Sequence, residues 1–303
     1  MWVRILGNGS GGPFRGRHYS AQVVHDRRHY FLVDCGEGAQ EQLHRYEMPV
    51  DRIQQIFITH LHGDHVFGLL GLLTSYSLKN REQTLQLFSP PGLAAFVFDA
   101  ARHCGIRFSF PLEFIEVGCE HSEHVFETKA IEVWTIPLRH GTPCVGWLFR
   151  EKPRPRNIRP ECIERYGLSF AQIRAIKEGA DLILADERIV PNEELTLPAK
   201  PLRSYAYCSD TAPSEEVADV VRGVSLLYHE ATFTSEHEKE AAEAFHSTAR
   251  QAAEIASAAQ AGQLLLGHFS GRYPDTTRHL CEAREIFPNT EVSVEGIEYA
   301  VGE

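Results

Sequence analysis

The chain has 303 residues, of which 43% are hydrophobic and 23% charged, an ordinary balance for a globular protein with a substantial core. No stretch approaches the roughly 20 apolar residues of a membrane span, and the amino terminus lacks a secretory signal, so we expect a cytoplasmic protein. The formal net charge of −11 means that any nucleic acid would have to bind at locally basic segments.

The seven cysteines are scattered, without a C-x-x-C pair, which argues against a disulfide framework and against a thiolate zinc site. The sixteen histidines are more informative, because neutral imidazole is the commonest protein ligand for zinc. We therefore expect any metal site to consist of histidine and carboxylate side chains.

The first part of the chain, up to about residue 140, is predicted to be rich in short strands separated by glycine loops. The strands expected from the pattern cover Ser20–Val24, Tyr30–Val33 and Gln55–Thr59. Residues 60–65, His-Leu-His-Gly-Asp-His, follow the third strand directly, and Phe67–Leu78 is long enough for a helix. A loop that leaves a buried strand is a common place for ligands in layered α/β folds.

Residues 150–203 differ in character, because prolines punctuate a polar stretch with one expected helix, Ser169–Glu178. We interpret this segment as an inserted arm. The compact pattern then resumes with strands and helices, expected over Ser204–Cys208, Leu226–Glu230, Ser247–Ala259 (helix), Leu264–Leu266 and Thr276–Glu285 (helix). A strand followed by a polar, ligand-type side chain occurs four times along the chain.

The spacing in residues 60–65 suits two neighbouring cations. Alternation places His60 and His62 on one side of an extended segment, and Gly63 allows the backbone to turn before Asp64 and His65. A polar exposed loop would be the alternative, but the motif follows an apolar strand directly.

The motif Thr59-His60-Leu61-His62-Gly63-Asp64-His65 resembles the signature of metallo-β-lactamase-fold hydrolases, and its residue sequence is similar to the form found in ribonuclease Z. The other segments that carry the resemblance occur in the family's order: 6–12, 34–38, 137–141, 208–211, 229–233, 246–248 and 267–270. It implies an α/β fold, a metallo-β-lactamase αββα sandwich, formed by a single domain over 1–303, with a protruding, flexible arm inserted at 150–203.

The resemblance also implies the metal ligands. His60, His62 and His140 would hold one zinc ion, Asp64, His65 and His268 the second, and Asp210 would bridge the two. Imidazole and carboxylate without thiolate independently suit Zn²⁺, and Mn²⁺ would also fit. Taken singly, His140, Asp210 or His268 is more often a hydrogen-bonded structural residue.

Three carboxylates and one histidine have candidate roles beside the metals. Asp34, in a glycine loop, would accept a ring N–H from a ligand histidine, or else cap a turn. His246 would donate a proton to the leaving 3′ oxygen, with Glu230 keeping it oriented and protonated. The alternative for His246 is a surface histidine at a helix start. Asp64 would add base character toward the attacking water.

Two basic segments could contact RNA. Arg15 and Arg17 lie in a loop that resembles the family's tRNA-contacting P-x-K-x-R-N loop imperfectly, and Lys152, Arg154 and Arg156 begin the arm. A solvated linker is the alternative for the second segment. The expected tip of the arm also lacks the Gly-Pro motif usual in bacterial members. In the family, a homodimer lets the arm of one subunit clamp tRNA that the other subunit cuts.

The sequence therefore favours a zinc-dependent endoribonuclease that cuts precursor tRNA on its 3′ side, leaving a 3′-hydroxyl on the tRNA and a 5′-phosphate on the trailer. A broad phosphodiesterase or arylsulfatase of the same fold is the main alternative. A non-catalytic RNA-binding protein and a β-lactam or thioester hydrolase are further ones, since fold does not imply function.

Overall fold

The computed structural model describes residues 1–199 and 201–302, and the side chain of Arg15 lies outside the described part. The chain divides into two compact units, Met1–Arg150 with Arg203–Glu303, and Glu151–Leu202. We use "main unit" for the first and "arm" for the second. In the described residues, no helix is both long and apolar enough to cross a membrane.

The described residues of the main unit form two mixed seven-stranded sheets. The first has the order β18-β1-β3-β4-β5-β6-β7 and contains β1 (Trp2–Gly7), β3 (Ala21–Asp26), β4 (His29–Val33), β5 (Ile53–Phe57), β6 (Leu85–Ser89), β7 (Leu112–Glu116) and β18 (Glu298–Ala300). The second has the order β17-β15-β14-β13-β10-β9-β8 and contains β8 (His124–Glu127), β9 (Ile131–Pro137), β10 (Val145–Glu151), β13 (Ser204–Cys208), β14 (Leu226–Glu230), β15 (Leu264–Gly267) and β17 (Thr290–Val292).

The two sheets pack face to face through an aromatic core. Phe57 of β5 meets Trp147 of β10 edge-on, with ring centroids 5.0 Å apart, and Phe31 of β4 meets Phe149 of β10 at 5.6 Å. All four side chains are fully buried. These rings come from opposite sheets, so their large apolar surfaces hold the sandwich together.

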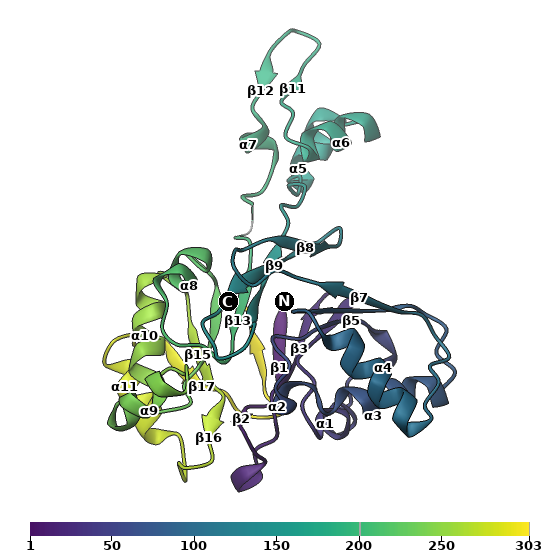
Figure 1. Ribbon diagram of the computed structural model, residues 1–303. Coiled ribbons are helices and arrows are strands. Elements are labelled where there is room, and N and C mark those ends of the chain that lie inside the picture. Colours follow the sequence, from purple (N-terminus) through teal and green to yellow (C-terminus); the bar gives the residue numbers. More distant parts are fainter. Residues whose placement is uncertain (200, 303) are drawn as a thin grey trace. The chain divides into compact units, whose positions relative to one another are not determined.

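Helices cover the outer face of each sheet (Figure 1). The first sheet carries α1 (Ala39–Arg45), α3 (Leu69–Leu78) and α4 (Leu93–Cys104), and the short α2 (Gly63–Val66) precedes α3. The second carries α8 (Glu215–Val220), α10 (Ala249–Ala258) and α11 (Thr277–Arg284), and α9 (Glu238–Glu243) lies before α10. These four layers are the αββα sandwich expected from the sequence, and the predicted fold class is confirmed.

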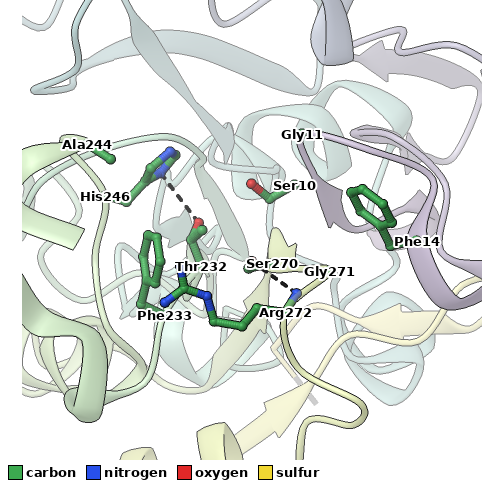
Figure 2. A pocket seen from close by; sticks show the side chains of 10 residues that line it. All are labelled: Ser10, Gly11, Phe14, Thr232, Phe233, Ala244, His246, Ser270, Gly271 and Arg272. Carbon is green, nitrogen blue, oxygen red and sulfur yellow. Dashed lines mark hydrogen bonds between the residues drawn. The ribbon is translucent and has the colours of Figure 1, made fainter. Parts of the chain in front are cut away.

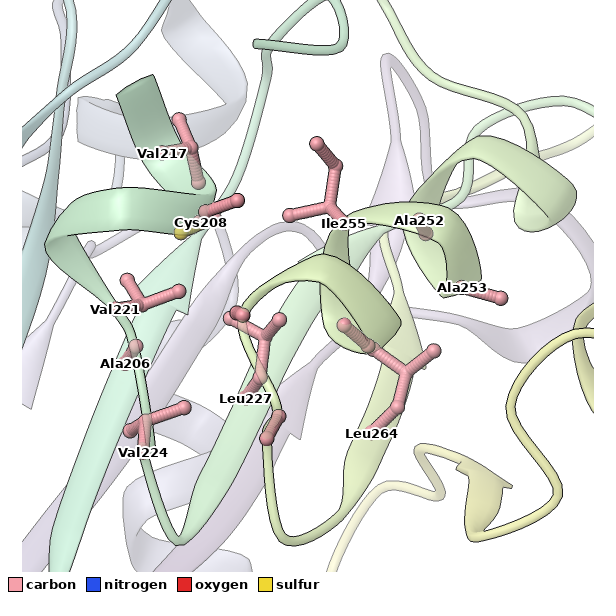
Figure 3. Close-up of a cluster of buried hydrophobic side chains, with 14 of the residues drawn as sticks. Ala206, Cys208, Val217, Val221, Val224, Leu227, Ala252, Ala253, Ile255 and Leu264 are labelled. Atoms are coloured by element: carbon pink, nitrogen blue, oxygen red, sulfur yellow. The ribbon is translucent and has the colours of Figure 1, made fainter. Parts of the chain in front are cut away.

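The alanine-rich helix α10 shows how the outer layers form. Thr248 caps its start, with Gln251 completing a reciprocal capping box. Its small buried side chains Ala252 and Ala253 let the helix lie close to the sheet residues Leu227 and Leu264 (Figure 3). Ile255 is the large apolar side chain that the helix adds to this layer, and the remaining buried positions of the helix are alanines.

The arm has a small apolar core of its own. It contains α5 (Pro160–Tyr166), α6 (Phe170–Lys177), the hairpin β11 (Leu182–Ile183) with β12 (Ile189–Val190), and α7 (Asn192–Leu195). Cys162, Ile176 and Leu195 are among the residues buried at its centre. The predicted helix at Ser169–Glu178 is confirmed as α6, which Ser169 caps. The remaining arm elements, and α1 and α4 in the main unit, were not expected from the sequence pattern.

Candidate metal centre

The predicted ligands come together at one edge of the sandwich, although they are far apart in sequence. His60 follows β5, His140 follows β9, Asp210 follows β13 and His268 follows β15. Parallel strands β13, β14 and β15 end at the same edge of their sheet, which brings their following residues together. The strand-to-ligand pattern thus produces a single cluster.

Potential ligand atoms lie within 4.8 Å of one another in three overlapping groups among the described residues. The first is His60, His62, His140 and Asp210, the second is Asp64, His65 and His268, and the third joins Asp210 and His268 to His246. In the first group, His62 Nδ1 lies 3.0 Å from His60 Nε2 and 3.2 Å from His140 Nε2. Asp210 contacts the first two groups, since its Oδ1 lies 3.1 Å from His268 Nε2 and its Oδ2 lies 3.7 Å from His60 Nε2.

Each buried ring has a partner on the side away from the cluster. Nδ1 of His65 donates to Asp34 Oδ2 at 2.7 Å, and Nδ1 of His60 lies 3.0 Å from the Thr59 hydroxyl. Nδ1 of His268 lies 3.0 Å from the Thr232 hydroxyl. In the neutral form of each ring, these contacts favour the proton on Nδ1 and a lone pair on Nε2, the atom that faces the cluster.

Two of those inward nitrogens support the interpretation as a metal site. His65 Nε2 and His268 Nε2 are buried and have no hydrogen-bond partner among the described residues, although both approach Asp210 Oδ1. A buried polar atom without a partner is costly unless another group satisfies it. Divalent cations would satisfy both, and a donor set of imidazole and carboxylate suits zinc.

The carboxylates and imidazole rings of the cluster shift one another's pKa values. Burial alone would raise the pKa of the Asp210 carboxyl, but the rings of His268 and His65 hold it well below its usual range. Burial likewise disfavours charge on His65, but the carboxylates of Asp210 and Asp34 raise its pKa well above the ordinary value. In the metal-free protein the His65 ring therefore carries a proton that a cation would replace.

A second pair lies next to this cluster. His246 Nδ1 bonds to Glu230 Oε1 at 2.7 Å, and Glu230 is fully buried at the end of β14. The same carboxylate accepts backbone N–H bonds from Thr211 and Thr232. Burial opposes charge on His246, yet the Glu230 carboxylate raises its pKa to about 9. His246 is thus held in one orientation with a proton to donate.

The backbone around Asp34 is tightly fixed. Asp34 has φ 54°, in the left-handed region that aspartate tolerates better than most residues. Cys35, the residue after Asp34, is hydrogen-bonded to α2 and to the segment that follows this helix. Cys35 N donates to His65 O at 2.8 Å, and Gly68 N donates to Cys35 O at 2.9 Å. A Cβ at Gly68 would come within 2.1 Å of the Gly36 oxygen, so only glycine allows this approach.

Comparison with known proteins identifies the family. Two family models match, that of the anti-Pycsar protein Apyc1 over residues 3–152 and that of a beta-lactamase superfamily domain over residues 191–269. Ribonuclease Z of Bacteroides thetaiotaomicron is 41% identical over 295 residues, which cover 97% of this chain and 93% of that protein. Ribonuclease Z of Porphyromonas gingivalis is 42% identical over 288 residues, covering 95% of each. The chain belongs to the ribonuclease Z family. It is therefore an enzyme of a family of metal-dependent hydrolases.

Solved structures support the fold of this ribonuclease Z family member. The short form of human tRNase Z matches with a TM-score of 0.71 and 24% identity over 99% of both chains. A diphosphatase of the PhnP family matches with a TM-score of 0.63 and 16% identity, covering 99% of this chain and 97% of that one. At these identities the likeness establishes the fold alone.

The basic residues proposed for RNA contact have varied surroundings in this family member. The side chain of Arg15 lies outside the described residues. Arg17 is half-buried, and its guanidinium lies 5.3 Å from the centre of the Phe269 ring. In the arm, Arg154 pairs with the buried Glu151, and Arg156 donates weakly to Asn192 and Thr196. RNA contact by these arginines, and by Lys152, stays a prediction.

Sequence reasoning overlooked the hydroxyl groups that orient the rings. Thr59 bonds to both oxygens of Asp34 and to the ring of His60, while Thr232 connects Glu230 with His268. Tyr207, from the second sheet, also donates to Asp34 at 3.0 Å. The positions of Thr59 and Thr232 inside the histidine motifs are a signal that could have found them, because a ligand ring needs a partner on its far nitrogen.

Proposed function

We propose that this protein is a zinc-dependent endoribonuclease that cleaves precursor tRNA on its 3′ side, leaving a 3′-hydroxyl on the tRNA and a 5′-phosphate on the trailer. The observation that carries the proposal is the 41% identity along nearly the whole chain to proteins named ribonuclease Z, because the fold alone hosts other activities. We further propose that it acts in the cytoplasm.

The ligand assignment supports two Zn²⁺ ions per chain, with Mn²⁺ as a substitute. His60, His62 and His140 would hold one ion and Asp64, His65 and His268 the other, with Asp210 between them. Seven potential ligands are too many for one tetrahedral zinc. When bound, such a metal pair supplies an activated water and neutralises charge on the phosphodiester.

The chain's own residues would complete the reaction. His246, oriented by Glu230, would donate its proton to the leaving 3′ oxygen, and its raised pKa of about 9 keeps that proton in place at neutral pH. Asp64 accepts the Gly11 N–H at 3.0 Å, which orients the carboxylate, and Asp64 would add base character toward the attacking water. Asp34 would hold the ring of His65 in the metal-binding tautomer.

The test is cleavage of a precursor tRNA transcript with a 3′ trailer, with both new ends mapped. The expected products are a tRNA ending in a 3′-hydroxyl and a trailer beginning with a 5′-phosphate. Asp210→Asn should abolish cleavage and metal uptake, whereas Asp219→Asn, on an exposed helix face, should change neither. Hydrolysis of bis(p-nitrophenyl) phosphate without tRNA cleavage would favour a broad phosphodiesterase instead.

The arm is proposed as the tRNA clamp, acting within a homodimer on substrate that the partner subunit cuts. Its basic start at Lys152, Arg154 and Arg156, together with Arg15 and Arg17 of the first loop, would supply positive charge against the net −11. The arm buries its own small core, which supports a role as a separate element.

Removal of the arm is feasible because Arg150 of β10 pairs directly with Ser204 of β13. Replacing residues 153–200 by a short Gly/Ser bridge should raise KM for precursor tRNA and flatten the salt dependence of binding, while hydrolysis of the small phosphodiester continues. Light scattering would report the dimer. An unchanged KM for tRNA in a folded deletion variant would rule out the clamp.

A further inference from the structure

A cavity of about 540 Å³ opens beside His246 and is lined by aromatic rings (Figure 2). Its walls include Phe14, Phe233 and Arg272, with Ser10 and Ser270 between them. The two serines are register partners in the small sheet of β2 (Gly9–Ser10) and β16 (Phe269–Ser270). This volume lies within the roughly 300–1,000 Å³ typical of small-molecule sites.

The two sides of the cavity differ in chemistry. Phe14, in the short helical turn Phe14–Gly16, has 56% of its surface exposed. Across the cavity from it, the Arg272 guanidinium lies 5.5 Å from the centre of the Phe233 ring, with Glu240 3.9 Å from the guanidinium. A flat aromatic face and a flat guanidinium face are the two surfaces on which nucleic-acid bases stack.

The ring of Phe14 lies close to the backbone at two glycines. A Cβ added at Gly12 would come 2.4 Å from this ring, and one added at Gly271 would come 2.3 Å from it. Neither position therefore accommodates a larger residue without moving the ring. The ring thus lies close to two glycines, and its exposed part lines the cavity, where it can contact a flat ligand.

We propose that this cavity binds the unpaired base of the nucleotide whose 3′ oxygen is the leaving group, the last nucleotide of the tRNA, between Phe14 and Arg272. The proposal rests on the proposed function. His246 borders the cavity and would protonate that oxygen, so the nucleotide carrying the oxygen extends from His246 into the space that His246 lines. Stacking contacts only the flat face of a base, which all four bases present. The cavity therefore accepts any unpaired base at this position.

The test combines enzyme variants with precursor tRNAs that lack one base. The substrates are an intact precursor, one that is abasic at the last tRNA nucleotide, and one that is abasic at the first trailer nucleotide. We expect the wild-type single-turnover rate to fall about 5- to 150-fold when the last tRNA nucleotide is abasic, the range for loss of one base stack. Loss of the first trailer base should have little effect.

The variants locate the effect. Phe14→Ala should slow cleavage of the intact precursor by a similar factor, and removal of the last tRNA base should then add little, because one interaction cannot be lost twice. Phe14→Tyr should restore most of the rate. Phe98→Ala, which removes a phenylalanine of similar exposure on α4, should behave as wild type. Metal content should stay that of the wild type in each variant.

Contrary results are equally specific. An unchanged wild-type rate with the abasic last nucleotide, or additive losses in Phe14→Ala, would overturn the base-binding proposal. If Phe14→Ala instead masks the loss of the first trailer base, the cavity binds the other side of the cleavage site. If the wild type hydrolyses bis(p-nitrophenyl) phosphate but cuts no precursor, the proposed function itself has failed.

Discussion

Replacement of Asp34 by asparagine tests how the ligand rings are oriented. Asp34 is fully buried, and its carboxylate accepts hydrogen bonds from four donors. These are the backbone N–H and the hydroxyl of Thr59, Nδ1 of His65 and the hydroxyl of Tyr207. Asparagine has nearly the same shape and tolerates the same left-handed backbone, so the change affects mainly the hydrogen bonds.

The magnitude follows from which donor loses its acceptor. With the new NH₂ group toward His65 and Tyr207, the ring must turn its Nδ1 into an acceptor, which moves the proton to Nε2. That nitrogen faces Asp210 at 3.3 Å and is the proposed ligand atom. Loss of such an orienting partner typically lowers metal affinity by about 10- to 100-fold. One buried donor left without an acceptor costs about 1–3 kcal/mol of stability.

The assay is zinc competition with a chelator of known affinity, together with urea unfolding of the metal-free protein. Asp26→Asn is the matched control, because Asp26 is an aspartate that is also fully buried. It is the last residue of β3, about 17 Å along the strand from Ala21, the first residue of that strand. We expect weaker zinc binding for Asp34→Asn and unchanged zinc binding for the control. Equal zinc affinities for Asp34→Asn and wild type would refute the tautomer argument.

Three further predictions concern the site and its electrostatics. His246→Ala should keep its metals but lower single-turnover tRNA cleavage by roughly 10² to 10⁴, the usual worth of a general acid, and loss of a metal by atomic emission would instead identify His246 as a ligand. Because the pKa of His65 is raised in the metal-free protein, zinc uptake must displace its proton, and apparent zinc affinity should therefore fall as pH is lowered. Chelator competition between pH 8 and pH 6 measures this affinity, and a zinc affinity that does not change over this range would contradict the prediction. Gln251→Ala should remove the bond from Thr248 N–H to the Gln251 side chain in the capping box of α10 and cost about 0.5–1.5 kcal/mol in urea unfolding, with no change in metal content.

The sequence predicted the strands that carry the ligands because each is an apolar run followed by a polar motif. The predicted strands Ser204–Cys208 and Leu226–Glu230 coincide with β13 and β14. The helix α4 was missed, although its signals are present: the buried Leu93, Val97 and Ala101 recur every four residues, and Gly105 ends the helix in the left-handed conformation. A broader expectation of strands in this region obscured that period.

The arm and the hydroxyl partners could not be predicted in the same way. The arm's core consists of few apolar side chains spread over short elements, so no window carries a clear period. The role of Thr232 depends on contacts with Glu230 and with His268, 36 residues later in the chain. Such contacts exist only after β14 and β15 have paired, and a local pattern cannot express them.

The proposed ligands come from both sheets, so metal affinity should depend on how the two sheets pack against each other. His60, His62, Asp64 and His65 follow β5 of the first sheet, whereas the others follow strands of the second. The bond from Tyr207 to Asp34 crosses the same interface. A ligand set of this kind binds well only while the two sheets keep their relative position, since a shift of a few tenths of an ångström changes every ligand distance. Substitutions in the aromatic layer, such as Trp147→Leu, should therefore weaken metal binding although they touch no ligand, and bound metal should in turn stabilise the sandwich in proportion to its affinity.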